Sequence, residues 1–239
     1  MSLKYGSTKW ELTQSKLSNI NFSNSKELPK AKLQKGEIDL AVDKLNFHYD
    51  NNNPILNDFS KSVNNFRCLG IIGNNGSGKS TLASLLLNLE KPISGSIKLN
   101  YTKNGNIDIG YLNQFPEKLL GIMTLEEFVQ LLVSNGKLDH SQLSKIDSIL
   151  RISNIAWENI KDTLALDLSW TTLRTALIII LSNCNYDLLI LDEPTFGMGN
   201  QQKLNLHSHF IRYLDEKHLI LISHDHKFIG SICDSIIKL

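Results

Sequence analysis

The sequence lacks any hydrophobic run long enough to cross a lipid bilayer. Its longest strongly apolar run, Ala176 to Leu181, is far shorter than the roughly 20 residues that a membrane-spanning helix needs. The N-terminus reads M-S-L-K-Y-G-S-T and lacks the apolar segment of a secretory signal peptide. These two absences exclude an integral membrane protein and a signal-bearing secreted one, as far as this sequence extends.

Cysteine is scarce, and charge of either sign is not in excess. The three cysteines, Cys68, Cys184 and Cys233, are odd in number and widely spaced, which predicts reduced core residues and excludes a disulfide framework. The net charge is +1, and 41% of the 239 residues are apolar. This length and composition fit one large α/β domain or two small ones.

The first 36 residues differ from the rest of the chain. They are rich in Ser, Asn and Lys, with seven lysines against two acidic residues. We interpret residues 1–36 as a basic polar arm or linker, most simply a solvated tether. Attraction to an anionic membrane surface or to a nucleic acid is the alternative. Residues 37–239 then form the main domain.

The pattern of apolar residues predicts strands that alternate with helices. Strands are expected at 38–49, 55–63, 66–72, 96–99, 108–112, 188–191 and 219–222. A helix is expected over 80–89, and a helical segment is inserted at about 115–170. This alternation favours an α/β fold with helices on both faces of a sheet, an antiparallel β subdomain near the N-terminus and an inserted α-helical subdomain.

A glycine-rich motif follows the strand L-G-I-I. It fits G-x-x-x-x-G-K-[ST] and predicts a P-loop, whose backbone N–H groups and following helix N-terminus bind phosphate. Lys79 would reach the β- and γ-phosphates, and the Ser80 hydroxyl would bind Mg²⁺. The alternative is a glycine-rich turn that happens to contain lysine. The nucleotide-binding residues predicted here are Gly73, Asn74, Asn75, Gly76, Ser77, Gly78, Lys79, Ser80 and Thr81.

Two carboxylates end the apolar strand L-L-I-L, at Asp192 and Glu193. Parallel strands deliver functional groups at their carboxyl ends. We expect Asp192 to contribute to the Mg²⁺ site and Glu193 to act as the base that holds the attacking water. The alternative interpretation of this pair is an acidic turn after a core strand, which the nearby P-loop disfavours.

Taken together, these motifs resemble those of the ATP-binding subunits of ABC transporters, over residues 37–239. Between the P-loop and L-L-I-L-D-E-P-T stands Y-L-N-Q, similar to the Q-loop, and after them stands I-S-H-D, similar to the switch-histidine loop. The resemblance implies that Gln114 binds Mg²⁺, that His224 contacts the γ-phosphate, and that Tyr49 stacks on adenine. Phe47 or His48 could replace Tyr49, and a metal site at residues 224–226 is the rival interpretation of H-D-H.

The resemblance breaks at the family's signature, L-S-G-G-Q, which caps the ATP bound by a partner domain in a head-to-tail dimer. Here the aligned residues read L-S-W-T-T. Ser169 is kept and can cap a helix, whereas Trp170 and Thr171 replace the glycines. The aspartate that usually follows T-x-G-L is also replaced, by Gly199. We therefore expect a weakened contact with the partner's ATP.

The resemblance implies an ATPase that energises a membrane transporter, using ATP and Mg²⁺, with Glu193 and His224 as the catalytic residues. The expected partners are a membrane transporter subunit and a second ATPase domain, in a heterodimer or a tandem chain; a homodimer is the alternative, and no specific nucleic acid is expected. The motifs F-P-E and T-L-E-E favour importers of the energy-coupling-factor or cobalt type. The chain should lie in the cytoplasm, on the inner face of the membrane. A soluble ABC-type ATPase acting on ribosomes or DNA, or a low-activity regulatory subunit, is the alternative.

Overall fold

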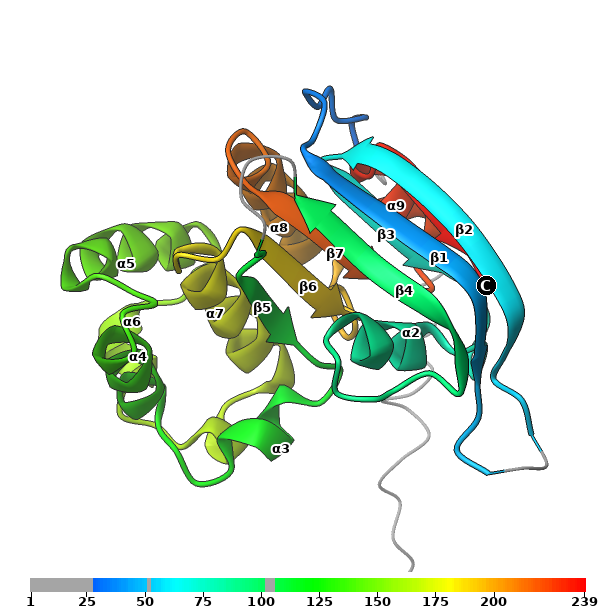
Figure 1. The fold of residues 1–239 in the computed structure, drawn as a ribbon. Coiled ribbons are helices and arrows are strands. Elements are labelled where there is room, and N and C mark those ends of the chain that lie inside the picture. The colour runs from blue at the N-terminus through cyan, green and yellow to red at the C-terminus, as the bar shows by residue number, and fades with distance from the viewer. Residues whose placement is uncertain (1–27, 51–52, 102–105) are drawn as a thin grey trace, which may run out of the picture.

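Two β-sheets share one hydrophobic core in the computed structural model, which describes residues 28–50, 53–101 and 106–239 (Figure 1). The first sheet is antiparallel and has the order β2-β1-β4, with bounds Leu56–Phe66, Ile38–Phe47 and Ser94–Tyr101. The second is parallel and has the order β5-β6-β7-β3-β8. Its strands span Ile109–Leu112, Leu188–Asp192, His218–Ile222, Cys68–Ile72 and Ser235–Lys238.

The parallel sheet is covered on both faces, which explains its nearly continuous apolar strands. Successive side chains of a strand point to opposite faces. Leu188 and Ile190 of β6 join the core shared with the antiparallel sheet and helix α2 (Lys79–Leu86). Leu189 and Leu191 join the core on the other face. The α/β architecture with helices on both faces is therefore confirmed.

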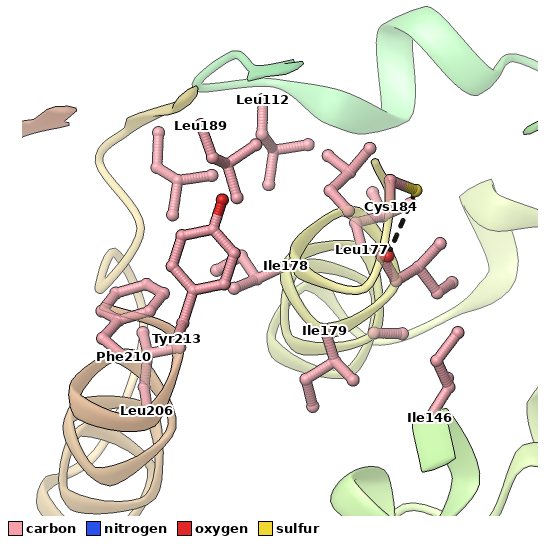
Figure 2. Close-up of a cluster of buried hydrophobic side chains, with 14 of the residues drawn as sticks. Leu112, Ile146, Leu177, Ile178, Ile179, Cys184, Leu189, Leu206, Phe210 and Tyr213 are labelled. Atoms are coloured by element: carbon pink, nitrogen blue, oxygen red, sulfur yellow. Dashed lines mark hydrogen bonds between the residues drawn. The ribbon is translucent and has the colours of Figure 1, made fainter. Parts of the chain in front are cut away.

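The second face packs against α7 (Trp170–Ser182), α8 (Asn200–Tyr213) and α9 (His226–Ile232). Figure 2 shows side chains of α7 enclosed by Leu189 of the sheet, Tyr213 of α8 and Ile146 of α5. Every residue of α7 from Leu173 to Leu181 is buried. This helix is therefore fixed from all sides.

The inserted helical segment forms a lobe beside β5 (Figure 1). It contains α3 (Pro116–Leu120), α4 (Leu125–Ser134), α5 (Leu143–Ile152) and α6 (Trp157–Ile160), with short 3-10 turns at His140–Gln142 and Ala165–Asp167. Helix α4 starts with a capping box, because the Thr124 and Glu127 side chains bond each other's backbone N–H. These elements run from Pro116 to Asp167, and the bounds of about 115–170 for a separate subdomain stay a prediction.

Several predicted boundaries were wrong. The strand expected from Phe66 begins at Cys68, because Phe66 still pairs with Ile38 in the antiparallel sheet. The chain changes sheet at Arg67, whose N–H donates to the Asp234 carboxylate (2.8 Å). Strand β1 ends at Phe47 and helix α2 at Leu86, each earlier than expected. Strand β8 was not predicted, since S-I-I-K is a short edge strand with little apolar pattern.

Most of the predicted arm lies outside the described residues. Its last part packs against the domain: Leu28, Ala31 and Leu33 contact the core around α8 and α9. The Ala31 N–H donates to the Ser231 carbonyl (2.7 Å). The division at residue 36 stays a prediction, but residues 28–36 are not a free linker where they make these contacts.

The three cysteines are buried and form no disulfide, as predicted. The Sγ atoms of Cys68 and Cys233 lie 3.3 Å apart, in hydrogen-bond contact, and burial raises the pKa of the Cys68 thiol well above its ordinary value. Over the described ranges, every helix is too short or too polar to traverse a bilayer.

Candidate active site

The loop between β3 and α2 needs its glycines for two different reasons. Gly76 and Gly78 have φ of 80° and 91°, in the left-handed region that favours glycine. A Cβ on Gly78 would also lie 2.7 Å from the Ile55 side chain, whereas one on Gly76 would meet nothing within 4 Å. The loop therefore wraps around open space at the N-terminus of α2, where an anion is stabilised by backbone N–H groups and the helix dipole.

That open space is a cavity of 330 Å³. It brings together the P-loop and the ends of the neighbouring strands β5 and β6. Its lining residues are Ile55, Asn75, Gly76, Gly78, Lys79, Ser80, Thr81, Gln114, Asp192 and Glu193. The parallel pairing of β5 with β6 explains why Gln114 and the two carboxylates meet.

The cation and the hydroxyl of the P-loop both contact neighbouring protein groups, and their contacts with phosphate and Mg²⁺ stay predictions. The Lys79 ammonium is buried and donates to the carbonyls of Gly73 (3.0 Å) and Asn74 (2.9 Å). The Ser80 hydroxyl donates to the Asp192 carboxylate at 2.6 Å. Burial raises the pKa of Asp192, while the bond from Ser80 opposes that rise.

Oxygen donors that suit Mg²⁺ therefore converge in the cavity. Ser80, Gln114 and Asp192 offer a hydroxyl, an amide and a carboxylate, which are the hard ligands that Mg²⁺ prefers beside phosphate oxygens. Within the described ranges, no group of three or more His, Cys, Asp and Glu side chains converges as a metal site. The residues present fit Mg²⁺ shared with a bound phosphate better than an all-protein metal cage.

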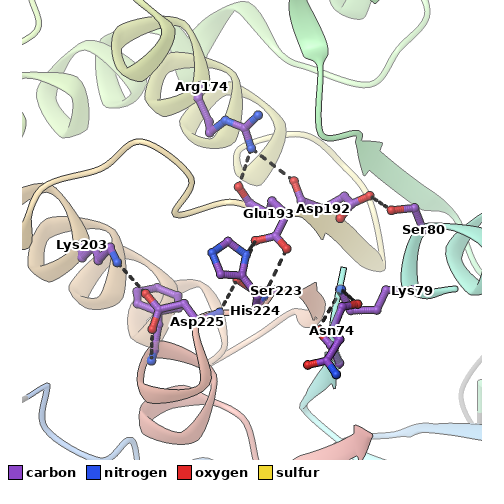
Figure 3. A network of polar contacts seen from close by, with 12 residues as sticks. Asn74, Lys79, Ser80, Arg174, Asp192, Glu193, Lys203, Ser223, His224 and Asp225 are labelled. Atoms are coloured by element: carbon purple, nitrogen blue, oxygen red, sulfur yellow. Dashed lines mark hydrogen bonds and ion pairs between the residues drawn. The ribbon is translucent and has the colours of Figure 1, made fainter. Parts of the chain in front are cut away.

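Glu193 is anchored in the turn after β6 (Figure 3). Its buried carboxylate accepts hydrogen bonds from the Ser223 hydroxyl (2.9 Å) and the His224 backbone N–H (3.2 Å). The Nδ1 atom of His224 lies 2.9 Å from Glu193 Oε2. Glu193 itself has φ of 50°, which an L-residue adopts only at a cost. Backbone strain of this kind is frequent at active sites and ligand-binding sites.

Contacts with helices α8 and α9 hold the turn that carries His224. Asp225 caps α9 by accepting from the Phe228 N–H (3.1 Å), and it also pairs with Lys203 of α8 at 2.6 Å (Figure 3). His224 remains half exposed beside Glu193 and lines an adjoining hollow of 480 Å³ with residues 195–198. The histidine can therefore turn toward a ligand while its loop stays in place.

Tyr49 stands apart from the cavity lining. Its ring is 63% exposed and lies edge-on to Phe47, with the ring centroids 4.9 Å apart. Phe47 is buried and is therefore a poor substitute for Tyr49 in stacking. An exposed aromatic face suits a nucleobase, but stacking of adenine on Tyr49 stays a prediction.

Ser169 caps α7, as expected. Its hydroxyl accepts from the Thr172 N–H (3.2 Å) and lies 2.7 Å from the Thr172 hydroxyl. The indole of Trp170 packs within its own chain, with Phe115 and Phe196 both 6.0 Å away in edge-to-face geometry. That Trp170 and Thr171 weaken contact with a partner's ATP stays a prediction.

Two residues that contact the predicted site residues were not identified from the sequence. Ser223 stood inside the motif I-S-H-D, and its place beside His224 was the available signal. Arg174 carried no such signal. It is a basic residue inside an apolar helix, and only the fold shows that its guanidinium donates hydrogen bonds to loops distant in sequence. It is fully buried, and its guanidinium donates to the carbonyls of Gln114, Asp192 and Glu193.

The fold and the site define a P-loop nucleotide-binding domain. The ABC transporter family profile matches residues 56–196. A zinc import ATP-binding protein ZnuC of Buchnera aphidicola is 32% identical over 77% of this chain and 74% of its own length. An energy-coupling factor transporter ATP-binding protein of Clostridioides difficile is 31% identical over 76% of the chain and 67% of its own length. The chain belongs to the ABC transporter ATP-binding family.

Other relatives are much longer. A putative ABC transporter ATP-binding protein of Clostridium tetani is 29% identical over 91% of this chain, which spans 51% of that protein. The chain thus covers about half the length of this relative, and 37% of a similar one from Lactiplantibacillus plantarum. Among solved structures, an ATP-binding subunit of an ABC transporter has a TM-score of 0.67 over 84% of this chain and 85% of its own, at 22% identity. At that identity the likeness concerns the fold alone.

Proposed function

We propose that this chain binds ATP with Mg²⁺ in the P-loop cavity, hydrolyses it, and so energises solute transport by a membrane subunit. The observation that carries the proposal is the meeting of the P-loop with Gln114, Asp192 and Glu193 around one cavity. Lys79 and the loop N–H groups hold the phosphates. Ser80, Asp192 and Gln114 hold Mg²⁺, which offsets negative charge on the phosphate oxygens.

Hydrolysis transfers the γ-phosphoryl group of ATP to water, with ADP as the leaving group. The Glu193 carboxylate accepts the proton of the attacking water as the new P–O bond forms and the bond to ADP breaks. Ser223 and the backbone N–H of His224 keep the carboxylate in one orientation. The His224 ring, adjacent and half exposed, donates a hydrogen bond to the γ-phosphate and helps to orient the water.

The proposed working form is a head-to-tail dimer with a different ATPase domain. The groups offered to the chain's own ATP are complete, whereas L-S-W-T-T offers a partner's ATP no glycine and a serine engaged with Thr172. The greater length of the Clostridium tetani relative leaves room there for a second such domain. A partner with an intact signature would complete this chain's site, in a heterodimer or within one polypeptide.

Import is the proposed direction of transport. The relatives named for zinc import and for energy-coupling factor transport support it, as do the motifs after Gln114. The chain would lie in the cytoplasm on the inner face of the membrane, with the lobe containing α3 and α4 next to the membrane subunit.

Replacing Glu193→Gln tests the chemistry. We expect MgATP binding to be kept while hydrolysis falls by about 10²–10⁴-fold, the usual contribution of a general base. Glu216→Gln, on an exposed glutamate, is the matched control and should change neither. Unaltered hydrolysis in Glu193→Gln would contradict the proposal, and fast hydrolysis by the isolated chain would contradict the need for a different partner.

A further inference from the structure

Arg174 lies in the second turn of α7, and its guanidinium connects two segments that are distant in sequence, the loop after β5 and the turn after β6. The Nη1 atom donates to the backbone carbonyls of Asp192 (3.2 Å) and Glu193 (2.5 Å), and Nη2 donates to that of Gln114. Figure 3 shows the guanidinium above the two acidic residues, directed at their main chain. The Arg174 side chain is fully buried, so the guanidinium and not water bonds these carbonyls.

Trp170, one helical turn earlier, covers this guanidinium. The Arg174 Cζ atom lies 4.9 Å from the centroid of the indole, within the range of a cation–π interaction. The same indole contacts Phe115, next to Gln114, and Phe196, three residues after Glu193. The rings therefore span the same two loops that the guanidinium joins through their carbonyls.

The backbone at Glu193 needs such support. Its left-handed conformation, with φ of 50°, is unfavourable for a residue with a side chain, and Arg174 bonds the carbonyl of that residue. A planar guanidinium can reach several carbonyls at once, whereas a lysine ammonium on a flexible stem cannot reproduce that geometry. The site thus depends on this side chain as arginine, not merely as a cation.

We infer that Arg174 is a positioning residue, covered by Trp170, which sets the backbones of Gln114, Asp192 and Glu193 so that their side chains meet Mg²⁺ and the γ-phosphate together. The inference rests on the proposed function. It gives Trp170 a role inside its own chain: the residue that replaces a signature glycine stabilises the chain's own ATP site.

The test compares ATP affinity with and without Mg²⁺, using a fluorescent ATP analogue and the full chain. Residues that orient metal ligands typically change metal affinity by 10–100-fold when replaced. We expect Arg174→Met to lose about 10-fold or more of the Mg²⁺-dependent gain in affinity, with little change in metal-free binding. Arg174→Lys should fall between Arg174→Met and the wild type. Thr175→Val, at the adjacent buried position of α7, is the matched control and should resemble the wild type.

An equal loss of affinity with and without Mg²⁺ would overturn the inference, because it would indicate general damage. So would an unchanged Mg²⁺ dependence in Arg174→Met, or an equal effect of Thr175→Val. If Arg174→Met does not fold, the comparison of Arg174→Lys with the wild type decides by the same criterion.

A second readout needs no nucleotide. Tryptophan emission should shift when Arg174 is replaced by Lys in the wild type, and should not shift when the same change is made in a Trp170→Phe background. If the wild type fails to bind ATP, the proposed function fails, while this spectrum still reports whether Arg174 and Trp170 interact. An identical spectrum with and without the Arg174 change would overturn the packing on which the inference rests.

Discussion

Ser223→Ala should impair hydrolysis without impairing ATP binding. The Ser223 side chain is fully buried, and its hydroxyl donates to Glu193 Oε2 at 2.9 Å and accepts from the Asp225 N–H at 3.1 Å. Alanine fills nearly the same space, so the loss is one of hydrogen bonds and not of packing. A hydrogen bond to a charged group contributes about 1.5–3 kcal/mol, which corresponds to roughly 10- to 150-fold in rate if it is all expressed in the transition state.

Steady-state ATP hydrolysis and urea unfolding measure the two consequences. We expect kcat to fall by about 10-fold or more, while KM for ATP stays nearly constant because the P-loop is untouched. The free energy of unfolding should fall by about 1–3 kcal/mol. Ser231→Ala is the control, since that buried hydroxyl bonds only the Phe228 carbonyl (2.7 Å) among the contacts described. Equal effects on kcat in both variants, or a raised KM with unchanged kcat in Ser223→Ala, would refute the reasoning.

Two further predictions concern glycine and pH. Gly73→Ala should abolish ATP binding, because its Cβ would lie 2.8 Å from the Leu239 carbonyl oxygen and 2.5 Å from the Ser77 hydroxyl oxygen. Gly230→Ala, whose Cβ would meet nothing within 4 Å in α9, should raise the melting temperature by stabilising the fold by about 0.5–1 kcal/mol. Wild-type ATP binding by Gly73→Ala, or an unraised melting temperature of Gly230→Ala, would contradict these predictions. Burial lowers the pKa of His209 to about 4, with its Nε2 atom 2.7 Å from the Ser182 hydroxyl. The unfolded chain therefore binds a proton that the fold excludes, and this histidine should contribute a loss of stability of up to about 3 kcal/mol as the pH drops from 6.5 to 4. Urea unfolding at several pH values should show that His209→Gln loses less stability than the wild type over this range.

Local sequence patterns predicted the fold class and most of the strands. The P-loop and the acidic pair on β6 are contiguous motifs whose chemistry follows from residue type and spacing, and the structure brings them together with Gln114 around one cavity. The positions of strands β6 and β7 were also predicted, because strands that are buried on both faces consist of continuous apolar runs. Tyr49, by contrast, was assigned to adenine stacking only from its distance along the chain to Lys79. That stacking stays a prediction.

The remaining features depend on contacts between distant segments. The sheet change at Arg67 needs the carboxylate of Asp234, which lies 167 residues away in sequence. Trp170 was interpreted as an obstacle to a partner because only its place in the motif was visible. Its contacts with Phe115 and Phe196 arise from tertiary packing, which periodicity does not report, whereas its contact with Arg174 follows from their i,i+4 spacing in α7.

The asymmetric pairing of two ATPase domains is the central claim, and one mixing experiment tests it most directly. A complementary copy of this chain would carry Trp170→Gly, Thr171→Gly and Thr172→Gln to supply a signature, and Lys79→Ala to disable its own P-loop. Mixed with the unmodified chain, it should raise ATP hydrolysis by about 10-fold or more over either protein alone, because one glycine-bearing signature now meets one intact site. When Glu193→Gln is made in the unmodified copy, it should abolish the gain of the mixture. The same substitution in the complementary copy should leave that gain intact. Hydrolysis by the unmodified chain alone at the rate of the mixture would contradict the account.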